Sequence, residues 1–204
     1  MSLIIGICGG SGSGKTSFLN LIKQKVKNVS YMSYDSYYKD CSHLVLEERN
    51  KLNFDCPTQL DEEEFIKDVL LLKQGLSVDI PIYDFSTHTR CRETQRIESC
   101  KVIIIEGILI YSSQKLRDLF DLKIFIDAAE NVRLNRRIRR DCIERGRTEE
   151  SVREQFTNTV KPMHDLYVDS SKEMADVIIP NNGESGFNSL VVDCIVKYIQ
   201  SKAK

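Results

Sequence analysis

The stretch GGSGSGKT, residues 9–16, decides the fold, and it follows directly on the apolar run LIIGIC of residues 3–8. It fits the pattern G-x-x-x-x-G-K-[ST], in which glycines let backbone N–H groups surround phosphates that a Cβ would obstruct. The apolar run is typical of a buried parallel strand, and FLNLIKQKV after the loop has helical spacing. Phosphates would then lie at a helix N-terminus, where the dipole favours anions. The stretch therefore predicts a site for a nucleoside triphosphate.

Individual positions of this loop have distinct expected roles. Lys15 can reach the β- and γ-phosphates, and the Thr16 hydroxyl can hold Mg²⁺. The residues expected to bind the nucleotide in this region are Gly9, Gly10, Ser11, Gly12, Ser13, Gly14, Lys15, Thr16 and Ser17.

Length and composition restrict the class of protein. The 204 residues suit a single domain over residues 1–204, and the 29 Lys and Arg against 30 Asp and Glu give no global field for nucleic acid or a membrane surface. No apolar run is long enough to cross a bilayer, and nothing resembles a signal peptide. The scattered cysteines contain no C-x-x-C pair, which argues against zinc and redox sites. A cytoplasmic protein without nucleic-acid or membrane partners is expected.

Apolar runs alternate with helical patterns along the chain, which predicts parallel strands joined by helices. The expected strands are residues 3–8, 30–34, 101–105, 123–126 and 176–179. Helices are expected after the phosphate loop and at about 61–74, 131–144, 149–172 and 187–202. Residues 77–98 break the alternation and predict a β-hairpin, in which Pro81 fits an edge strand. The expected fold class is α/β, a phosphate-loop NTPase with a five-stranded parallel sheet flanked by helices and a hairpin insertion.

Two acidic residues follow expected strands of the sheet. Asp35 comes after residues 30–34 and could accept a proton from an attacking hydroxyl, orient that hydroxyl or bind a Mg²⁺ water. Glu106 follows a strongly apolar strand and would hold a Mg²⁺ water beside Thr16, while Gly107 would let the chain pass close to the phosphates. The alternatives are a loop-capping aspartate and a strand-end acid that faces solvent. The expected metal site thus comprises Thr16, Asp35 and Glu106.

Seven arginines lie between residues 133 and 147. At helical spacing Arg133, Arg137 and Arg140 share one face, and Gly146 ends the helix so that Arg145 and Arg147 stand on a loop. Guanidinium groups bind phosphate oxygens and neutralise charge in a transition state, so residues of about 133–147 predict a lid over transferring phosphates. A solvated basic helix is the alternative for some of them. Acidic residues at 141, 144, 149 and 150 interrupt the patch and disfavour a nucleic-acid site.

The hairpin mixes aromatic and polar residues. Tyr83, Phe85 and His88 suit a flat heterocycle such as a nucleobase, and Asp55 in the stretch NFD could pair with sugar hydroxyls. Taken singly, each of these residues is more often part of a core or a surface than of a ligand site.

In combination these motifs resemble those of the uridine kinase (uridine–cytidine kinase) family of phosphate-loop nucleoside kinases. The match runs in order through GGSGSGKT, SYDSYY, NFDCP, PIYDFSTHTR, IIIEGIL, RDCIERGR and ADVIIP. The resemblance implies transfer of the γ-phosphoryl group of ATP or GTP, with Mg²⁺, to the 5′-hydroxyl of uridine or cytidine. Such a reaction forms UMP or CMP in pyrimidine salvage. The resemblance also implies a homo-oligomer, with a tetramer as the common form.

The resemblance assigns roles residue by residue. Asp35 matches the catalytic base, while Lys15, Arg140 and Arg145 match groups that meet the transferring phosphates. Asp55 matches the acid that grips the ribose 2′- and 3′-hydroxyls. The other residues implied in nucleoside binding are Tyr83, Phe85, His88, Arg137, Arg147 and Gln155. Glu184 falls near the place where the family touches adenine.

Three positions depart from the family pattern. Cys56 and Thr58 replace the usual histidine and aspartate of the NFD-x-P region, and Tyr34 replaces a common glutamine. None of these changes removes an expected catalytic group, but each could alter substrate preference or pocket polarity.

Other functions remain as alternatives. A related small-molecule kinase, such as a phosphoribulokinase, pantothenate kinase or nicotinamide riboside kinase, is the closest, and the hairpin motif YDFSTHTR argues against it. A GTP-hydrolysing switch would need N-K-x-D, whereas the nearest string, NKLN at 50–53, ends in asparagine. A catalytically silent relative is disfavoured because Lys15, Thr16, Asp35 and Glu106 are all retained.

Overall fold

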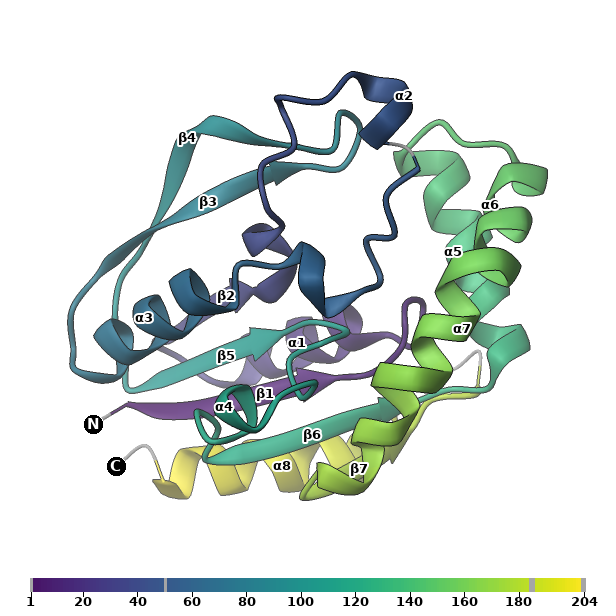
Figure 1. Cartoon of the computed structure of the whole chain (residues 1–204). Coiled ribbons are helices and arrows are strands. Elements are labelled where there is room, and N and C mark those ends of the chain that lie inside the picture. The colour runs from purple at the N-terminus through teal and green to yellow at the C-terminus, as the bar shows by residue number, and fades with distance from the viewer. Residues whose placement is uncertain (1, 50, 184–185, 203–204) are drawn as a thin grey trace.

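The computed structural model describes residues 2–49, 51–183 and 186–202. A parallel sheet of five strands forms its centre, in the order β2-β5-β1-β6-β7 (Figure 1). The strands are β1 (Leu3–Cys8), β2 (Val29–Ser33), β5 (Val102–Glu106), β6 (Leu122–Asp127) and β7 (Val177–Pro180). The five expected strands are confirmed, each within one residue at both ends.

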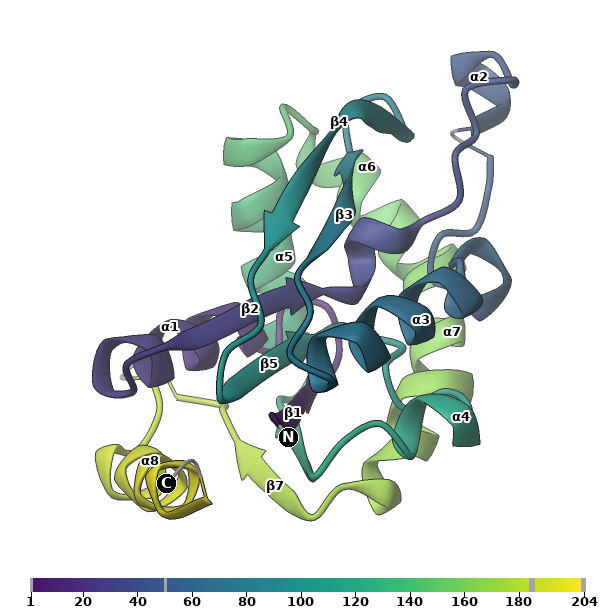
Figure 2. The same ribbon diagram turned by 90° about the vertical axis from the view of Figure 1, so that its left-hand side faces the viewer.

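Helices cover both faces of the sheet because its strands are apolar on both sides. In β1, Ile5 and Ile7 pack against α1 (Lys15–Lys25) and α8 (Ser189–Lys202). The alternate residues Ile4 and Cys8 face a second core, which contains α3 (Glu62–Lys73) and α4 (Gln114–Arg117). Figure 2 shows these two helix layers on opposite sides of the sheet. The expected helices after the phosphate loop, at 61–74 and at 187–202 are confirmed.

The hairpin stands apart from the main sheet. Within the described residues, strands β3 (Val78–Asp84) and β4 (Thr89–Ile97) pair only with each other, so each has one free edge that suits a residue such as Pro81. In the turn, Asp84 accepts hydrogen bonds from Ser86 and Thr87, which hold the pKa of Asp84 down to about 2. The hairpin lies above β2 and β5, together with the short helices η1 (Tyr34–Tyr37), α2 (Leu46–Arg49) and η2 (Pro57–Gln59) (Figure 1).

Helix α5 (Glu130–Glu144) and the segment after it form the opposite wall (Figure 1). The single helix expected over 149–172 is wrong in its detail. It begins as α6 (Glu149–Gln155), widens into π-helical turns at η3 (Phe156–Val160) and η4 (His164–Val168) around α7 (Lys161–Met163), and ends in the 3₁₀ segment η5 (Asp169–Met174). Pro162, inside α7, has no N–H to continue the α-helical hydrogen-bond series, so the regular repeat breaks in this region.

None of the helices in the described part of the chain is long and apolar enough to cross a membrane.

Candidate active site

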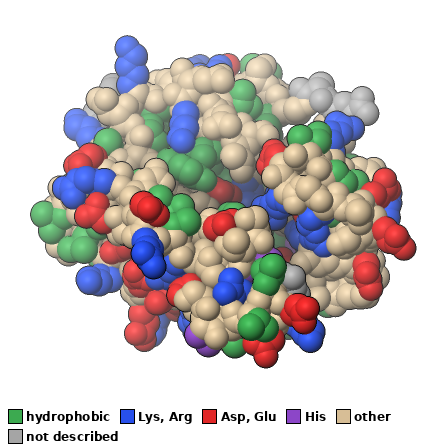
Figure 3. Space-filling model, turned by 90° about the horizontal axis from the view of Figure 1, so that it is seen from above, with side chains coloured by type: hydrophobic (Ala, Val, Ile, Leu, Met, Phe, Trp, Pro, Cys, Tyr) green, Lys and Arg blue, Asp and Glu red, His purple; other side chains and the backbone are tan. Residues whose placement is uncertain are grey.

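A cavity of about 690 Å³ opens where the carboxyl ends of the sheet strands meet the hairpin and α5. Figure 3 views the molecule from above, over the hairpin, and shows Lys and Arg side chains gathered in a recess. The cavity wall brings together all the residues expected in catalysis, nucleoside binding and metal binding. They are Lys15, Thr16, Asp35, Asp55, Tyr83, Phe85, His88, Glu106, Arg137, Arg140, Arg145, Arg147 and Gln155.

The phosphate loop forms the floor of this cavity at the start of α1. Of the expected nucleotide-binding residues, Ser11, Lys15 and Thr16 reach the wall. The Nζ atom of Lys15 donates to the carbonyl oxygens of Gly9, at 2.9 Å, and Gly10, at 3.3 Å, so it braces the loop from within. The other expected nucleotide-binding residues of the loop do not line the cavity. The expected adenine contact, Glu184, lies outside the described residues.

The loop also lies against α5 so closely that glycine is required. Gly12 has a φ of +79°, and a Cβ there would overlap the carbonyl oxygen of Arg133. On the far side, Asn181 donates through Nδ2 to the carbonyl oxygen of Ser13 at 2.7 Å, and Arg136 donates to the carbonyl oxygen of Asn181 at 3.0 Å. Residues after β7 and on α5 therefore hold the phosphate loop on both sides.

Two carboxylates face each other beside Lys15. Glu106 ends β5 and is buried, and its Oε1 accepts hydrogen bonds from the Tyr31 hydroxyl at 3.0 Å and from Ser33 Oγ at 3.3 Å. Asp35 lies in η1, and its enclosed Oδ1 has no hydrogen-bond partner among the described residues. Burial, with the nearby charge of Glu106, raises the pKa of Asp35 to about 7, although Lys15 opposes the shift. An aspartate with this pKa is suited to accept a proton near neutral pH.

The same residues fit a magnesium ion. Mg²⁺ keeps several waters and takes one or two protein carboxylates together with substrate phosphates. The described residues contain no group of three or more His, Cys, Asp or Glu side chains that could hold a metal. They do offer the unpartnered Oδ1 of Asp35, the carboxylate of Glu106 and the Thr16 hydroxyl on one cavity wall. This partial oxygen set matches a metal that arrives with a triphosphate.

The raised pKa of Asp35 predicts a pH-dependent stability. An unfolded Asp35 releases its proton near 3.8, whereas the folded one keeps it to about 7, so the folded state loses stability as pH rises through this window. We expect Asp35→Asn to raise the free energy of unfolding at pH 8 by no more than about 4 kcal/mol, since each pKa unit corresponds to about 1.4 kcal/mol.

Urea denaturation in EDTA at pH 4 and pH 8 measures this difference. Asp193→Asn, on the outer layer formed by α8, is the matched control, and it should give equal shifts at both pH values. A gain for Asp35→Asn that is no larger at pH 8 than at pH 4 would contradict the electrostatic account.

The other end of the cavity is aromatic. The ring of His88 stacks on Phe54 with centroids 4.4 Å apart and planes at 8°, and Tyr83 contacts Tyr38 at 5.1 Å. Desolvation, together with the positive charges of Arg145 and Arg147, lowers the pKa of His88, so its ring is neutral at pH 7. His88 Nδ1 and the Tyr83 hydroxyl are buried without a partner among the described residues. These groups suit an uncharged flat ligand with its own donors and acceptors.

Charged groups separate the aromatic end from the phosphate loop. Burial raises the pKa of Asp55, and the opposite charge of Arg137 lowers it. Arg137 donates to Gln155 Oε1 at 2.9 Å and to Ser11 Oγ at 3.0 Å, and Arg147 also donates to Gln155. Asp55 therefore offers acceptor oxygens on the cavity wall, near the positive charge of Arg137.

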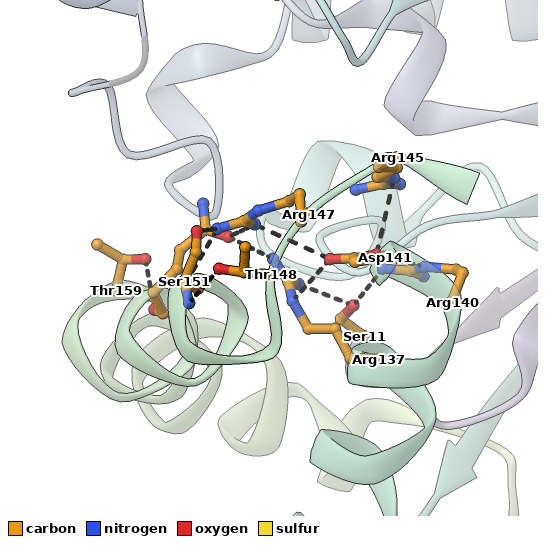
Figure 4. A network of polar contacts seen from close by, with 10 residues as sticks. Ser11, Arg137, Arg140, Asp141, Arg145, Arg147, Thr148, Ser151 and Thr159 are labelled. Carbon is orange, nitrogen blue, oxygen red and sulfur yellow. Dashed lines mark hydrogen bonds and ion pairs between the residues drawn. The ribbon is translucent and has the colours of Figure 1, made fainter. Parts of the chain in front are cut away.

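The acidic residue at 141 is placed differently from the expectation. Asp141 was expected to interrupt a basic patch, but its side chain is fully buried among the arginines of the lid region (Figure 4). Its neighbours Arg137, Arg140, Arg145 and Arg147 all lie within 4 Å of its carboxylate. Arg133 belongs to neither the surface nor the cavity wall, since it is buried between the phosphate loop and Phe156.

Several wall and supporting residues escaped the sequence analysis. Tyr31 and Ser33 hold Glu106 because Ser33 is its register partner across β2 and β5, a relation that needs the strand pairing. Phe54 was visible in the NFD stretch, but its stacking on His88 was not. Further wall residues are Tyr38, Ser86, Ile108 and Ser151.

The family departures lie away from the wall. Cys56 and Thr58 contact each other at 3.2 Å near the surface, and Tyr34 is a core residue that packs on Phe65 with ring centroids 4.4 Å apart. Gly107 was expected to allow a close approach to phosphates. In the structure a Cβ there would instead crowd Tyr34 and Ile110.

The sheet order, the loop between β1 and α1 and the carboxylates at the strand ends define a phosphate-loop kinase fold. Solved structures agree at the level of the fold. The phosphoribulokinase of Rhodobacter spheroides has a TM-score of 0.67 at 15% identity, covering 88% of this chain and 70% of that one. The D-glycerate 3-kinase of Cryptococcus neoformans var. grubii also has a TM-score of 0.67, at 19% identity, covering 89% and 86%.

The chain belongs to the Phosphoribulokinase / Uridine kinase family, whose sequence profile matches residues 4–186. Among its relatives, a protein of Lactococcus lactis subsp. lactis named uridine kinase is 48% identical over 98% of this chain and 97% of its own length. A uridine kinase of Chloroflexus aurantiacus is 45% identical, covering 98% and 95%. Membership of this family implies a nucleotide as phosphate donor. The expected resemblance and fold class are confirmed.

Proposed function

We propose that this protein is a nucleoside kinase that transfers the γ-phosphoryl group of ATP or GTP to the 5′-hydroxyl of uridine or cytidine, with Mg²⁺. One observation carries the proposal. A single cavity joins a phosphate loop to an aromatic compartment, where the buried Tyr83 hydroxyl and His88 Nδ1 have no hydrogen-bond partner among the described residues, and Asp35 lies on the cavity wall. The near-full-length similarity to proteins named uridine kinase supports the same substrate class.

The protein's contribution to the reaction is positioning and charge. Asp35 accepts the proton of the 5′-hydroxyl, for which its raised pKa suits it. Asp55 binds the ribose hydroxyls, and the neutral His88 donates to or accepts from the pyrimidine edge. Lys15 releases its loop carbonyls to meet the β- and γ-phosphates, while Arg140 and Arg145 neutralise charge on the group in transfer. Thr16, Asp35 and Glu106 would hold Mg²⁺, which offsets phosphate charge when bound.

A substrate panel tests this function. A coupled assay for ADP formation should detect turnover with uridine or cytidine and none with ribulose 5-phosphate, pantothenate or nicotinamide riboside. Turnover with one of the last three alone would replace the proposal with that related kinase activity.

The sequence pattern and the family resemblance support proposals for the remaining properties. We propose that residues 1–204 act as one domain, in which the hairpin of about 77–98 and the lid of about 133–147 close over the nucleoside. The protein is proposed to act in the cytoplasm, as a homo-oligomer such as a tetramer, without nucleic-acid or membrane partners. Sedimentation of the purified protein measures the oligomer, and a monomer at micromolar concentration would contradict it.

His88→Ala is expected to weaken nucleoside binding more than nucleotide binding. The imidazole stacks on Phe54 in the aromatic compartment, so its loss removes both a hydrogen-bonding group and one wall of the base site. We expect KM for uridine to rise by about 30-fold, the equivalent of one lost hydrogen bond with some packing, with KM for ATP within about twofold.

Steady-state kinetics with each substrate varied separately measures the two constants. His43, an exposed residue before α2, provides the control His43→Ala, which should change neither. Equal increases in both KM values for His88→Ala would indicate a packing role alone.

A further inference from the structure

A single buried carboxylate lies inside the arginine cluster of the lid. The side chain of Asp141 is 0% exposed, with Nε of Arg140 at 2.9 Å from its Oδ1 and Nε of Arg137 at 3.4 Å from its Oδ2 (Figure 4). Nε of Arg145 lies 3.7 Å from Oδ1, and Nη1 of Arg147 lies 3.9 Å from Oδ2. One negative charge thus faces four positive charges at close range.

The side of each guanidinium that meets Asp141 is informative. Arg137, Arg140 and Arg145 all approach it through Nε, the donor nearest the backbone. A guanidinium carries five donors in a rigid fork, so an Nε contact leaves the outer Nη groups available for other partners. Arg137 and Arg140 turn these outer groups toward Ser11 Oγ of the phosphate loop, at 3.0 Å and 3.4 Å.

The backbone of Asp141 fixes the lid turn as well. Its carbonyl oxygen accepts the N–H groups of both Arg145 and Arg147 at 3.2 Å, and Gly146 between them has a φ of +62°. Asp141 therefore has two roles. Its backbone carbonyl holds the turn that carries Arg145 and Arg147, and its carboxylate balances the charge of four arginines. Only the side-chain contacts depend on the buried carboxylate, since any residue at this position supplies the backbone carbonyl.

Without the Asp141 carboxylate, placing these arginine side chains close together would be energetically unfavourable. Desolvation lowers the pKa of Arg145, and the charge of Arg140 lowers it further, which means that these cations repel each other. Without a counter-charge the side chains would turn toward solvent, and they would have to reassemble in every turnover. Groups that are already in place cost no reorganisation when charge develops in a transition state.

We propose that Asp141 is a positioning residue for phosphoryl transfer, which holds Arg137, Arg140 and Arg145 at the cavity wall before the triphosphate binds. The inference rests on the proposed kinase function, because its main readout is turnover. Asp141 acts through the arginines, so its effect must depend on their presence.

A double-mutant cycle tests this dependence. Asp141→Asn is expected to lower kcat by about 30-fold, below the loss that follows removal of a direct transition-state donor. In the Arg140→Gln background the same change should lower kcat by less than about threefold, because residues in one ion-pair network are not additive. Equal losses in both backgrounds would overturn the proposal. Glu144→Gln, which removes an exposed charge three residues along the chain, should leave kcat unchanged.

The double variant also covers the case in which Asp141→Asn fails to fold. Asp141→Asn/Arg140→Gln has the net charge of the wild type, so it relieves the repulsion that the single change creates. If the double variant folds and matches Arg140→Gln in kcat, the proposal stands. If it folds with a kcat about tenfold or more below Arg140→Gln, the proposal is wrong.

Limited trypsin digestion gives a readout that needs no activity. Without ligand, Asp141→Asn should be cleaved after Arg145 or Arg147 several times faster than wild type or Glu144→Gln, because both arginine side chains lose their ion pairs with the carboxylate. Equal cleavage rates would overturn the positioning role. If the wild type phosphorylates no nucleoside, the proposed function fails, while the digestion still decides whether Asp141 holds the lid.

Discussion

Replacing Asp35 with asparagine is expected to lower kcat by about a thousandfold, within the range that a positioned general base contributes. The amide keeps the size and polarity of the carboxyl but cannot take the proton of the attacking hydroxyl. The Kd for ATP should stay the same or fall slightly, because a negative charge beside the phosphate loop is removed. The enclosed position of Asp35 Oδ1, which has no partner among the described residues, is the structural reason to expect so large a loss.

Two measurements separate this loss from a folding defect. Titration of the nucleotide at equilibrium gives Kd directly, and single-turnover kinetics gives the rate of the chemical step. Asp193→Asn, a surface aspartate paired with Lys25, is the matched control and should behave as wild type in both. Turnover of Asp35→Asn within about tenfold of wild type would remove Asp35 from the role of base.

The sheet could be predicted from the sequence because its strands are covered on both faces. Such strands read as short apolar runs, and residues 102–105 at β5 are the clearest case, since all of them are buried. The phosphate loop was equally legible, since its glycines and Lys15 have fixed spacing. The sheet order was not predictable, because neighbouring strands such as β2 and β5 are far apart in the chain.

The residues that line the cavity were predicted from the sequence, whereas the residues that support them were missed. Residues that would touch a ligand belong to motifs, but Tyr31 and Ser33 support Glu106 only through the pairing of β2 with β5. Asp141 was misinterpreted because an acid on an arginine-rich helix is usually solvated. A signal did exist, since Arg137 lies four residues before Asp141 on the same face of the expected helix.

The second large effect is expected at Glu106. The hydrogen bonds that the carboxylate accepts from described residues, Tyr31 and Ser33, go to Oε1, so Oε2 is the oxygen left for a Mg²⁺ water. Glu106→Gln removes the charge that makes this position favourable for a cation. We expect kcat to fall by about 100-fold and the Mg²⁺ concentration for half-maximal rate to rise by about tenfold or more. Tyr31→Phe keeps the carboxylate and loses only its support, so its effects should be smaller but of the same kind.

Rates measured across a Mg²⁺ titration at saturating nucleotide test whether Glu106→Gln has a larger effect than Tyr31→Phe. Glu63→Gln, an exposed change on α3, should give the wild-type titration curve. If Glu106→Gln lowers the rate but leaves the Mg²⁺ dependence unchanged, Glu106 supports the fold of the strand end rather than the metal. If Tyr31→Phe shifts the Mg²⁺ dependence and Glu106→Gln does not, the hydroxyl acts independently of the carboxylate. Only a graded shift, small for Tyr31→Phe and large for Glu106→Gln, is consistent with a metal held through Glu106 and oriented from β2.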